Sequence, residues 1–359
     1  MVFVYGIKIV DEVKMDISVI IPVYNAPHEL FDKCIESLLR QKGNYELLFV
    51  NDGSTDKWIE ERINKAVSDD PRVRYIKKRH SGLCDTRNIG LAEAKGTYLT
   101  FVDADDVVLD GAFEQMLLYT IETGADVSIF GISTNYSHES IKKILSKSEI
   151  EDMIWGCLAY RTSKYVKLGF IVDSTWAKLY RKSVIDDNKL KFEASICKSE
   201  DAIFDVWFYQ YANTIYVDNM PVYDYVFNPQ SISHAYKYEY VEMIPLYLKA
   251  KEEFIDIFYG NNIRFRQAVA IRTIVALMDA DHCYFSLYHP QKTFFQIVKE
   301  FRKLLNNPIV ARNLKNVDFS LLNENQLTGI VNKMKLFFYK KRMVEVDMLL
   351  FRMFHLIRK

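Results

Sequence analysis

The sequence predicts an α/β protein with a mainly parallel sheet, followed by a helical C-terminal region. Between residues 16 and 109, short β-branched runs alternate with stretches of helical spacing. The runs are hydrophobic almost without interruption, which is typical of strands buried on both faces. From about Tyr238 to the end, apolar residues recur every three or four positions and predict helices.

The first elements form a β–α–β unit. "DISVIIPVYN" (16–25) is a β-branched run closed by Pro, Tyr and Asn, the stretch 28–41 has helical spacing, and "YELLFVNDGSTD" (45–56) is a second strand that closes in a turn. Strands that alternate with helices in this way predict parallel pairing with helices on both faces.

The same alternation continues toward residue 133. We expect the following elements, in order: a polar helical stretch, a strand at 73–78, a helix at 85–96 ended by Gly96, a strand at the start of 98–109, a helix at 112–123 and a strand at 125–133. A loop-rich region then runs through 174–185 and 198–212. The boundaries expected are an extension at 1–14, an α/β domain at 15–237 and a helical domain at 238–359.

Composition and charge limit the partners and the cellular compartment that we expect for this protein. The 359 residues carry no formal net charge, so no global field recruits nucleic acid. Five scattered cysteines without a CxxC pair argue against a disulfide framework or a zinc site and favour a reducing cytoplasm. The N-terminal stretch is interrupted by Lys8 and Asp11 too early for a secretory signal, and no apolar window is long enough to span a bilayer.

Polar residues follow three of the predicted strands. Tyr24 and Asn25 follow the first, Asp52 the second, and Asp103 and Asp105 the strand in "YLTFVDADDVVL". Ligands of parallel sheets bind outside the carboxyl ends of the strands, so these groups should converge on a ligand. Turn and cap formation explains each cluster separately but predicts no convergence.

The "DADD" acids allow two interpretations. Two carboxylates spaced i, i+2 can present oxygen ligands to Mg²⁺ or Mn²⁺, which would in turn hold a diphosphate. Asp106, by contrast, is expected mainly to cap the following helix. The sequence has no GxxxxGK[ST] or GxGxxG turn, which argues against a P-loop nucleotidase and a nicotinamide enzyme.

Five motifs together resemble the family 2 glycosyltransferases of the GT-A fold, particularly bacterial enzymes of capsule and surface-polysaccharide assembly. They are "SVIIPVYN", "FVNDGSTD", "SGLCDTRNIGLAEAKGTYLTFVDADD", "WAKLYRKSVI" and "SEDAIFDV", in family order over roughly residues 15–235. The resemblance implies a GT-A domain and inverting transfer of a sugar from a nucleotide diphosphate donor, with a UDP-sugar as the expected donor.

The resemblance also assigns donor-binding residues. Pro22 and Tyr24 would line the nucleotide pocket, with Tyr24 against the base, and Asp52 would accept a hydrogen bond from the base. Gly82 would allow the backbone to approach the nucleotide closely. Arg87 stands where the family has a basic residue near the nucleotide, although Thr86 replaces the small residue usual before it.

The metal and the catalytic base are implied in the same way. Asp103 would bind the ribose or share the metal, and Asp105 would coordinate the Mn²⁺ or Mg²⁺ that bridges the diphosphate. His234 lies where some relatives supply a third metal ligand, and a structural role is the alternative. Asp201, the second acid of the "ED" pair, would be the base, supported by Glu200; an acid pair that merely favours a helix N-terminus is the alternative.

Three further interpretations stay open. Trp176 either stacks on a sugar ring or is buried, and Lys178 faces either a phosphate or water. The stretch 333–359 is basic on one face and rich in Phe, Leu and Met on the other. Such a helix can lie on the anionic inner face of a membrane, near a lipid-linked glycan acceptor, or pack on its own domain or on another copy of the chain.

The function expected from the sequence is therefore extension of a lipid-linked surface glycan by a cytoplasmic, metal-dependent inverting glycosyltransferase. The alternative is a non-catalytic subunit that binds a nucleotide-sugar or a partner transferase. The intact acidic pairs favour the enzyme.

Overall fold

The structure is a computed structural model that describes residues 15–135, 139–160, 162–196, 198–228, 239–281, 285, 292–318 and 330–357. The expected extension at 1–14 lies outside the described residues, as do the side chains of 239, 240, 330–332 and 351–357.

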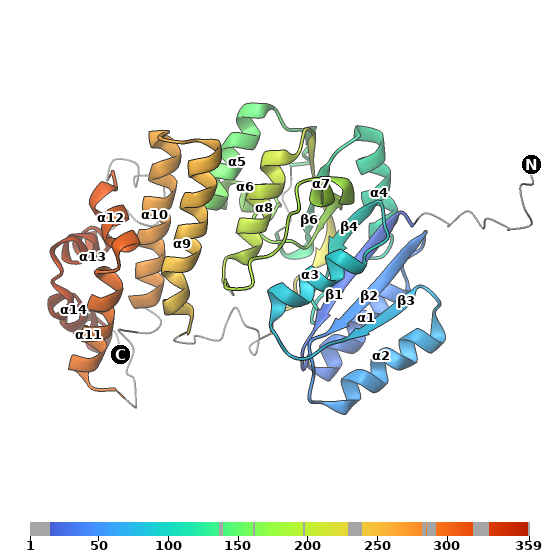
Figure 1. Ribbon diagram of the computed structural model, residues 1–359, viewed down its shortest axis with the longest axis horizontal. Coiled ribbons are helices and arrows are strands. Elements are labelled where there is room, and N and C mark those ends of the chain that lie inside the picture. Colours follow the sequence, from blue (N-terminus) through green and yellow to red (C-terminus); the bar gives the residue numbers. More distant parts are fainter. Residues whose placement is uncertain are drawn as a thin grey trace, which may run out of the picture.

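A nine-stranded sheet forms the centre of the N-terminal part (Figure 1). Its strands are β1 (Ile17–Val23), β2 (Tyr45–Asn51), β3 (Val73–Lys77), β4 (Tyr98–Phe101), β5 (Val107–Val108), β6 (Val127–Ile132), β7 (Lys142–Ile144), β8 (Lys178–Arg181) and β9 (Ile215–Asp224). The order is β3-β2-β1-β4-β8-β6-β9-β5, with β7 also paired to β9. Within the described residues, β1, β2, β3, β4, β6 and β9 run in one direction and β5, β7 and β8 in the other, so the expected mainly parallel sheet is confirmed.

Alternation along β1 explains why its sequence is apolar throughout. Val19 and Ile21 belong to one buried cluster, whereas Ile20 belongs to another. Successive strand side chains point to opposite faces, so both faces of this strand are covered. Helices α1, α2 and α4 contribute to the first cluster, and α3, α5 and α8 to the second.

Helices α1 to α4 lie where the sequence predicts helices, whereas α5, α6 and α7 form in the region that was expected to be loop-rich. The helices of the α/β part are α1 (His28–Leu39), α2 (Lys57–Asp69), α3 (Leu83–Glu93), α4 (Ala112–Thr123), α5 (Lys147–Ala159), α6 (Ser163–Lys167), α7 (Lys182–Asp187) and α8 (Glu200–Tyr211), with a 3₁₀ turn at Ser133–Asn135. Helix α4 has the predicted bounds. Helix α3 ends three residues before Gly96, because the chain is already extended at Ala94.

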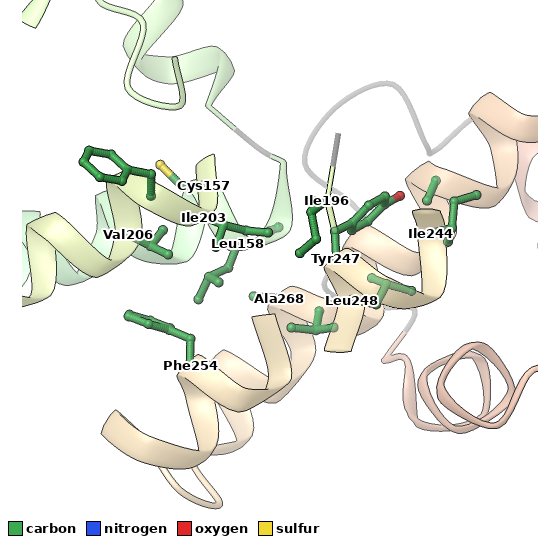
Figure 2. Packing of buried hydrophobic residues seen from close by; sticks show 14 of the residues in the cluster. Cys157, Leu158, Ile196, Ile203, Val206, Ile244, Tyr247, Leu248, Phe254 and Ala268 are labelled. Carbon is green, nitrogen blue, oxygen red and sulfur yellow. The ribbon is translucent and has the colours of Figure 1, made fainter. Parts of the chain in front are cut away.

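The C-terminal region is helical, as predicted. Its helices are α9 (Glu239–Phe258), α10 (Ile263–Ala280), α11 (Phe294–Leu305), α12 (Pro308–Asn316), α13 (Ile330–Lys341) and α14 (Val344–Ile357). Helix α9 packs on α8, and α10 packs on α5. Figure 2 shows this packing, in which Cys157, Ile203 and Val206 of the α/β part lie in one buried cluster with Phe254 and Ala268.

The basic C-terminal stretch is two helices rather than one. Helices α13 and α14 are separated at Arg342, which adopts a left-handed φ of 60°. Lys335, on α13, is buried and pairs with Asp281, so this face packs on the protein itself. Among the described residues, no helix combines the length and the apolar character that a bilayer span requires.

Replacement of Phe254 by Ala should destabilise the whole chain, because the fully buried Phe254 ring contacts Trp207 across the α8–α9 boundary. We expect a loss of about 3–5 kcal/mol in the free energy of unfolding, measured by urea denaturation. Ile257→Ala on the same helix removes a side chain that is 64% exposed and should change little. Two separate unfolding transitions in the wild type would contradict a shared core.

Candidate functional site

The carboxyl ends of β1, β2 and β4 lie at one edge of the sheet. Strand β1 pairs in parallel with β2 on one side and with β4 on the other. The segments that follow these strands are tied together, since the Asp52 N–H donates to the Val23 carbonyl at 2.8 Å. The strand-end residues predicted from the sequence therefore share this edge.

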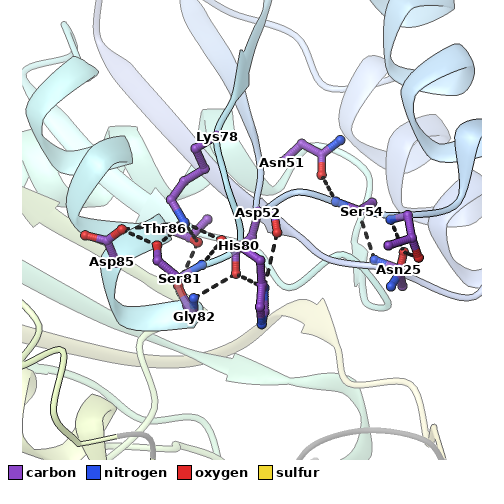
Figure 3. Close-up of polar contacts among 11 residues, drawn as sticks. Asn25, Asn51, Asp52, Ser54, Lys78, His80, Ser81, Gly82, Asp85 and Thr86 are labelled. Carbon is purple, nitrogen blue, oxygen red and sulfur yellow. Dashed lines mark hydrogen bonds and ion pairs between the residues drawn. The ribbon is translucent and has the colours of Figure 1, made fainter.

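Asp52 is the centre of a dense polar cluster (Figure 3). Its carboxylate accepts hydrogen bonds from the backbone N–H groups of Ser81, at 2.8 Å, and Gly82, at 2.9 Å. The Lys78 ammonium pairs with one carboxylate oxygen, and the His80 ring nitrogen lies 2.9 Å from the other. Asp52 is 3% exposed, so it fixes the loop before α3 to the end of β2.

The charge of Asp52 is stabilised by these partners. Burial by itself would raise its pKa, but the hydrogen bonds from Lys78 and from the Ser81 and Gly82 backbone outweigh burial and lower the pKa. Asp52 is therefore an anion that is already committed to protein donors.

Tyr24 lies beside this cluster. Its ring is 48% exposed and stacks on the ring of His80, with centroids 4.2 Å apart. Pro22 is buried within β1. Asn25, in a left-handed conformation, accepts the Thr55 N–H at 2.9 Å and so links the turns after β1 and β2. The pair of rings forms an exposed aromatic platform at the sheet edge.

Two glycines at this edge have backbone conformations with positive φ, which favour glycine. Gly82 has φ +98° and a Cβ would meet nothing within 4 Å, so its position is open to a ligand. Gly53 has φ +70°, and a Cβ would lie 2.8 Å from the His80 nitrogen. Sequence reasoning singled out Gly82 but missed Gly53, Lys78 and His80. The "NDGS" turn was a signal for the first, whereas long-range pairing with Asp52 defines the other two.

Arg87 connects the strand end to the start of α8. Its guanidinium lies 3.3 Å from Asp103, 3.5 Å from Glu200 and 2.5 Å from Asp201. The side chain is 2% exposed, with Phe192 against it at 5.2 Å. The structure thus brings together Asp103 and the "ED" pair around one buried cation.

Three carboxylates around one guanidinium leave an excess of negative charge. Burial raises the pKa of Asp103 to about 6, opposed by Arg87 and assisted by Asp201 and Asp105. Burial also raises the pKa of Glu200, and the charge of Asp201 adds to this effect while Arg87 opposes it. The cluster would therefore be stabilised by an additional cation.

Asp106 does not cap a helix, contrary to the expectation from sequence. Helix α4 begins at Ala112 and its N-cap is Gly111. Asp106 instead accepts hydrogen bonds from the Tyr223 hydroxyl at 2.7 Å and the Val226 N–H at 2.8 Å. Burial and the charge of Asp103 raise its pKa to about 8.

Trp176 and Lys178 are both buried. Trp176 is 8% exposed and stacks on Tyr223 with centroids 5.2 Å apart, so its burial is the alternative that the structure supports. Lys178 is fully buried and pairs with Asp205 at 2.7 Å. It faces neither water nor an open phosphate position.

Two acids of the "DADD" stretch have the type of ligand atom that a hard divalent cation prefers. Asp103 and Asp105 both offer carboxylate oxygens, and Asp105 is anchored by the Asn228 amide at 2.8 Å. Among the described residues, no group of three or more His, Cys, Asp or Glu side chains could surround an ion. His234, the predicted third ligand, lies outside the described residues.

Asp52→Asn should destabilise the fold at neutral pH by about 3 kcal/mol, because it leaves the Lys78 ammonium without its buried counter-ion. The folded state lowers the pKa of Asp52 below the ordinary 3.8, so this contribution is complete at neutral pH and is lost as the pH falls through the lowered value. Urea unfolding at pH 7 and pH 3 should show the gap between wild type and variant shrinking in acid.

Asp69→Asn provides the matched control, since it removes an exposed carboxylate paired with Lys65. An equal loss for Asp52→Asn at both pH values would show that charge is not the cause.

Comparison with known proteins finds similarity to glycosyltransferases over part of the chain. Residues 18–188 match the family model described as Glycosyl transferase family 2. The glycosyltransferase EpsJ of Bacillus subtilis is 29% identical over 226 residues, which are 60% of this chain and 62% of EpsJ. TarP of Staphylococcus aureus, a poly(ribitol-phosphate) beta-N-acetylglucosaminyltransferase, is 29% identical over 198 residues, 54% of this chain and 57% of TarP. The matches thus span less than two thirds of these relatives.

The fold has close counterparts among solved structures. TarS 1–349 of S. aureus in complex with UDP-GlcNAc superposes with a TM-score of 0.63 at 18% identity, covering 93% of this chain and 90% of that one. A longer TarS structure is covered over 54% of its length, with a TM-score of 0.59. At this identity the likeness establishes the GT-A-like fold alone. Residues 18–188 are thus similar to the Glycosyl transferase family 2 model and to proteins named glycosyltransferases.

Proposed function

We propose that this protein is an inverting glycosyltransferase that transfers a sugar from a nucleotide diphosphate donor, a UDP-sugar, to a hydroxyl of a surface-glycan acceptor. The observation that carries the proposal is the Arg87 ion-pair cluster, which holds Asp103 beside Asp201. A donor-binding acid and a base must lie close together in a single displacement, and this cluster meets that need.

The donor would bind along the sheet edge. The exposed Tyr24 ring offers a stacking surface for the base, and the open position at Gly82 lets the backbone approach. Asp52 would accept a base N–H in exchange for one of its present protein donors. The related fold of TarS, solved with UDP and with UDP-GlcNAc, supports a uridine nucleotide as the donor.

Asp105 and Asp103 would hold Mn²⁺ or Mg²⁺, which when bound supplies positive charge to the departing diphosphate. The excess negative charge around Arg87 supports this assignment, because a diphosphate would otherwise enter an acidic cluster.

Asp201 would act as the base. It accepts the proton of the acceptor hydroxyl as the oxygen bonds to the anomeric carbon, and the bond from that carbon to the diphosphate breaks on the opposite face. This single displacement inverts the anomeric centre. Arg87 acts as a positioning residue, since its short contact orients the Asp201 carboxylate. Glu200 supports the acceptor side.

The proposed acceptor is a lipid-linked glycan at the cytoplasmic face of the membrane. The C-terminal helices support this proposal, because Phe337, Met343 and Leu349 are exposed apolar side chains and Lys333 and Lys341 are exposed nearby in the sequence. Apolar and basic side chains together favour an anionic lipid surface. Contact with a second copy of the chain is the competing use of these helices.

UDP should raise the melting temperature of the wild type by about 5 °C at saturating concentration with Mn²⁺ present, and by much less with EDTA. Asp105→Asn should lose the Mn²⁺-dependent part, because it removes a carboxylate ligand. A thermal-shift assay measures both. A UDP effect that EDTA leaves unchanged would contradict the metal assignment.

Asp201→Asn should lower the rate of sugar transfer by about 10²–10⁴-fold and leave the UDP-induced thermal shift intact, since a base contributes to chemistry rather than to donor binding. Glu200→Gln should cost less. Transfer at the wild-type rate by Asp201→Asn would refute the base assignment. If the wild type binds UDP-sugars but neither hydrolyses nor transfers them, the protein is a binding subunit instead.

A further inference from the structure

Two buried cations lie where α5, α9 and α10 meet, away from the donor-binding residues. Arg272 on α10 is 3% exposed and Lys251 on α9 is 1% exposed. Helices α9 and α10 contact each other, and α10 also contacts α5. Buried Lys and Arg side chains are normally paired with an opposite charge, so this arrangement requires an explanation.

Arg272 makes no ion pair with the described residues. Its Nε and Nη1 atoms are buried and have no hydrogen-bond partner. The faces of the guanidinium are covered by the rings of Tyr160 and Tyr247, whose centroids lie 4.6 and 4.8 Å from Cζ. Aromatic faces compensate part of the lost hydration of the cation, but they leave the in-plane N–H groups unpaired.

Lys251 is little better satisfied. Among the described residues, its ammonium donates one hydrogen bond, to the Cys157 carbonyl at 2.9 Å, near the C-terminus of α5. An ammonium has three donors. Burial and, after it, the charge of Arg272 lower the pKa of Lys251 to about 7. Each cation thus makes the other less stable, which an anion between them would reverse.

The neighbouring acids do not fill this role. Asp173 and Asp279 are near enough to raise the pKa of Tyr160, after the larger effect of burial. Within the described residues, however, no carboxylate lies within 4.0 Å of a nitrogen of Arg272 or Lys251. The helix dipole of α5 explains the contact of Lys251 with Cys157 but gives the Arg272 N–H groups no acceptor.

Tyr160 is the exposed member of the cluster. It caps α5 in a left-handed conformation, with φ 56°, and its side chain is partly exposed, at 54% for the residue. A residue other than glycine in this conformation is unusual and is often found at functional positions. The Tyr160 ring thus joins the buried guanidinium, 4.6 Å from the ring centroid, to the surface.

We propose that Arg272 and Lys251 form a binding site for a phosphate group, with Tyr160 at its rim. A tetrahedral oxyanion offers oxygens in several directions and can accept from a guanidinium and an ammonium together, whereas the two oxygens of a carboxylate are coplanar. The phosphate belongs either to a phosphodiester in the acceptor or to a lipid headgroup. This extension to the acceptor rests on the proposed transferase function, but the anion site itself does not.

Inorganic phosphate tests the site directly. With EDTA present to keep cations from the donor site, phosphate should raise the melting temperature of the full-length wild type by about 3 °C relative to NaCl of equal ionic strength. Arg272→Met should lose this increment, and in NaCl it should melt no lower than the wild type, because it removes an unpaired buried charge.

Arg266→Met is the matched control on the same helix, since Arg266 is already paired with Asp256, and it should keep the phosphate increment. If Arg272→Met does not fold, Lys251→Met serves in its place and should lose the increment. An Arg272→Met variant with a lower melting temperature in NaCl and an unchanged phosphate increment would overturn the proposal and make Arg272 a packing residue.

Two further measurements identify the source of the phosphate. If the phosphate belongs to a soluble phosphodiester acceptor, Arg272→Met should raise the KM for that acceptor about tenfold. It should also abolish the preference of the enzyme for this acceptor over the same glycan without phosphate. For a headgroup, it should instead weaken sedimentation with phosphatidylglycerol vesicles. If the wild type transfers to no acceptor, the transferase proposal fails while the phosphate-binding result still decides the anion site. Loss of neither property would overturn the acceptor role.

Discussion

The buried guanidinium of Arg87 is the contact on which the geometry of the site depends. It joins a helix that follows β3 to the end of β4 and to the first turn of α8, more than a hundred residues later in the chain. A lysine could supply the charge but not the planar set of donors that reaches three carboxylates. Because the Nε atom is buried without a partner, the protein accepts an incomplete hydrogen-bond inventory here to hold these acids together.

The helical region and the α/β part share one hydrophobic core. One buried cluster extends from Ile20 and Leu48 in the sheet through α5 and α8 to α9 and α10. The domain boundary expected near residue 237 remains a prediction, since a change from alternating strands to helices in the sequence need not coincide with a break in packing. Helix α9 shares this core with the first turn of α8 and therefore contributes to holding Glu200 and Asp201 in place.

Local patterns in the sequence predicted the elements whose signals are local. Helix α4 could be bounded correctly because Gly111 and Gly124 both adopt left-handed conformations at its ends. Strand β8 forms in the region expected to be loop-rich, and its Lys178 pairs with Asp205, which comes 27 residues later in the chain. Asp106 was misread because its partners lie 117 and 120 residues away.

The candidate site shows the same division. The strand-end residues Tyr24, Asp52 and Asp103 were found because parallel pairing makes their convergence predictable. The family resemblance supplied the pair at the start of α8, and the structure adds that Arg87 faces this pair. The sequence could not identify Lys78 and His80 as partners of Asp52, since nothing in a polar loop shows which acid its side chains will contact.

The segment that follows β9 has a consequence for how the "DADD" loop can respond to ligands. Asn228 holds Asp105, the Val226 N–H holds Asp106, and the Tyr223 hydroxyl bridges the Asp103 N–H and the Asp106 carboxylate. A ligand that rearranges the loop must therefore shift the equilibrium of this segment. By thermodynamic reciprocity, a contact that repositions this segment changes the affinity of the aspartates by the same factor. The loop after β4 and the segment after β9 thus form one linked system.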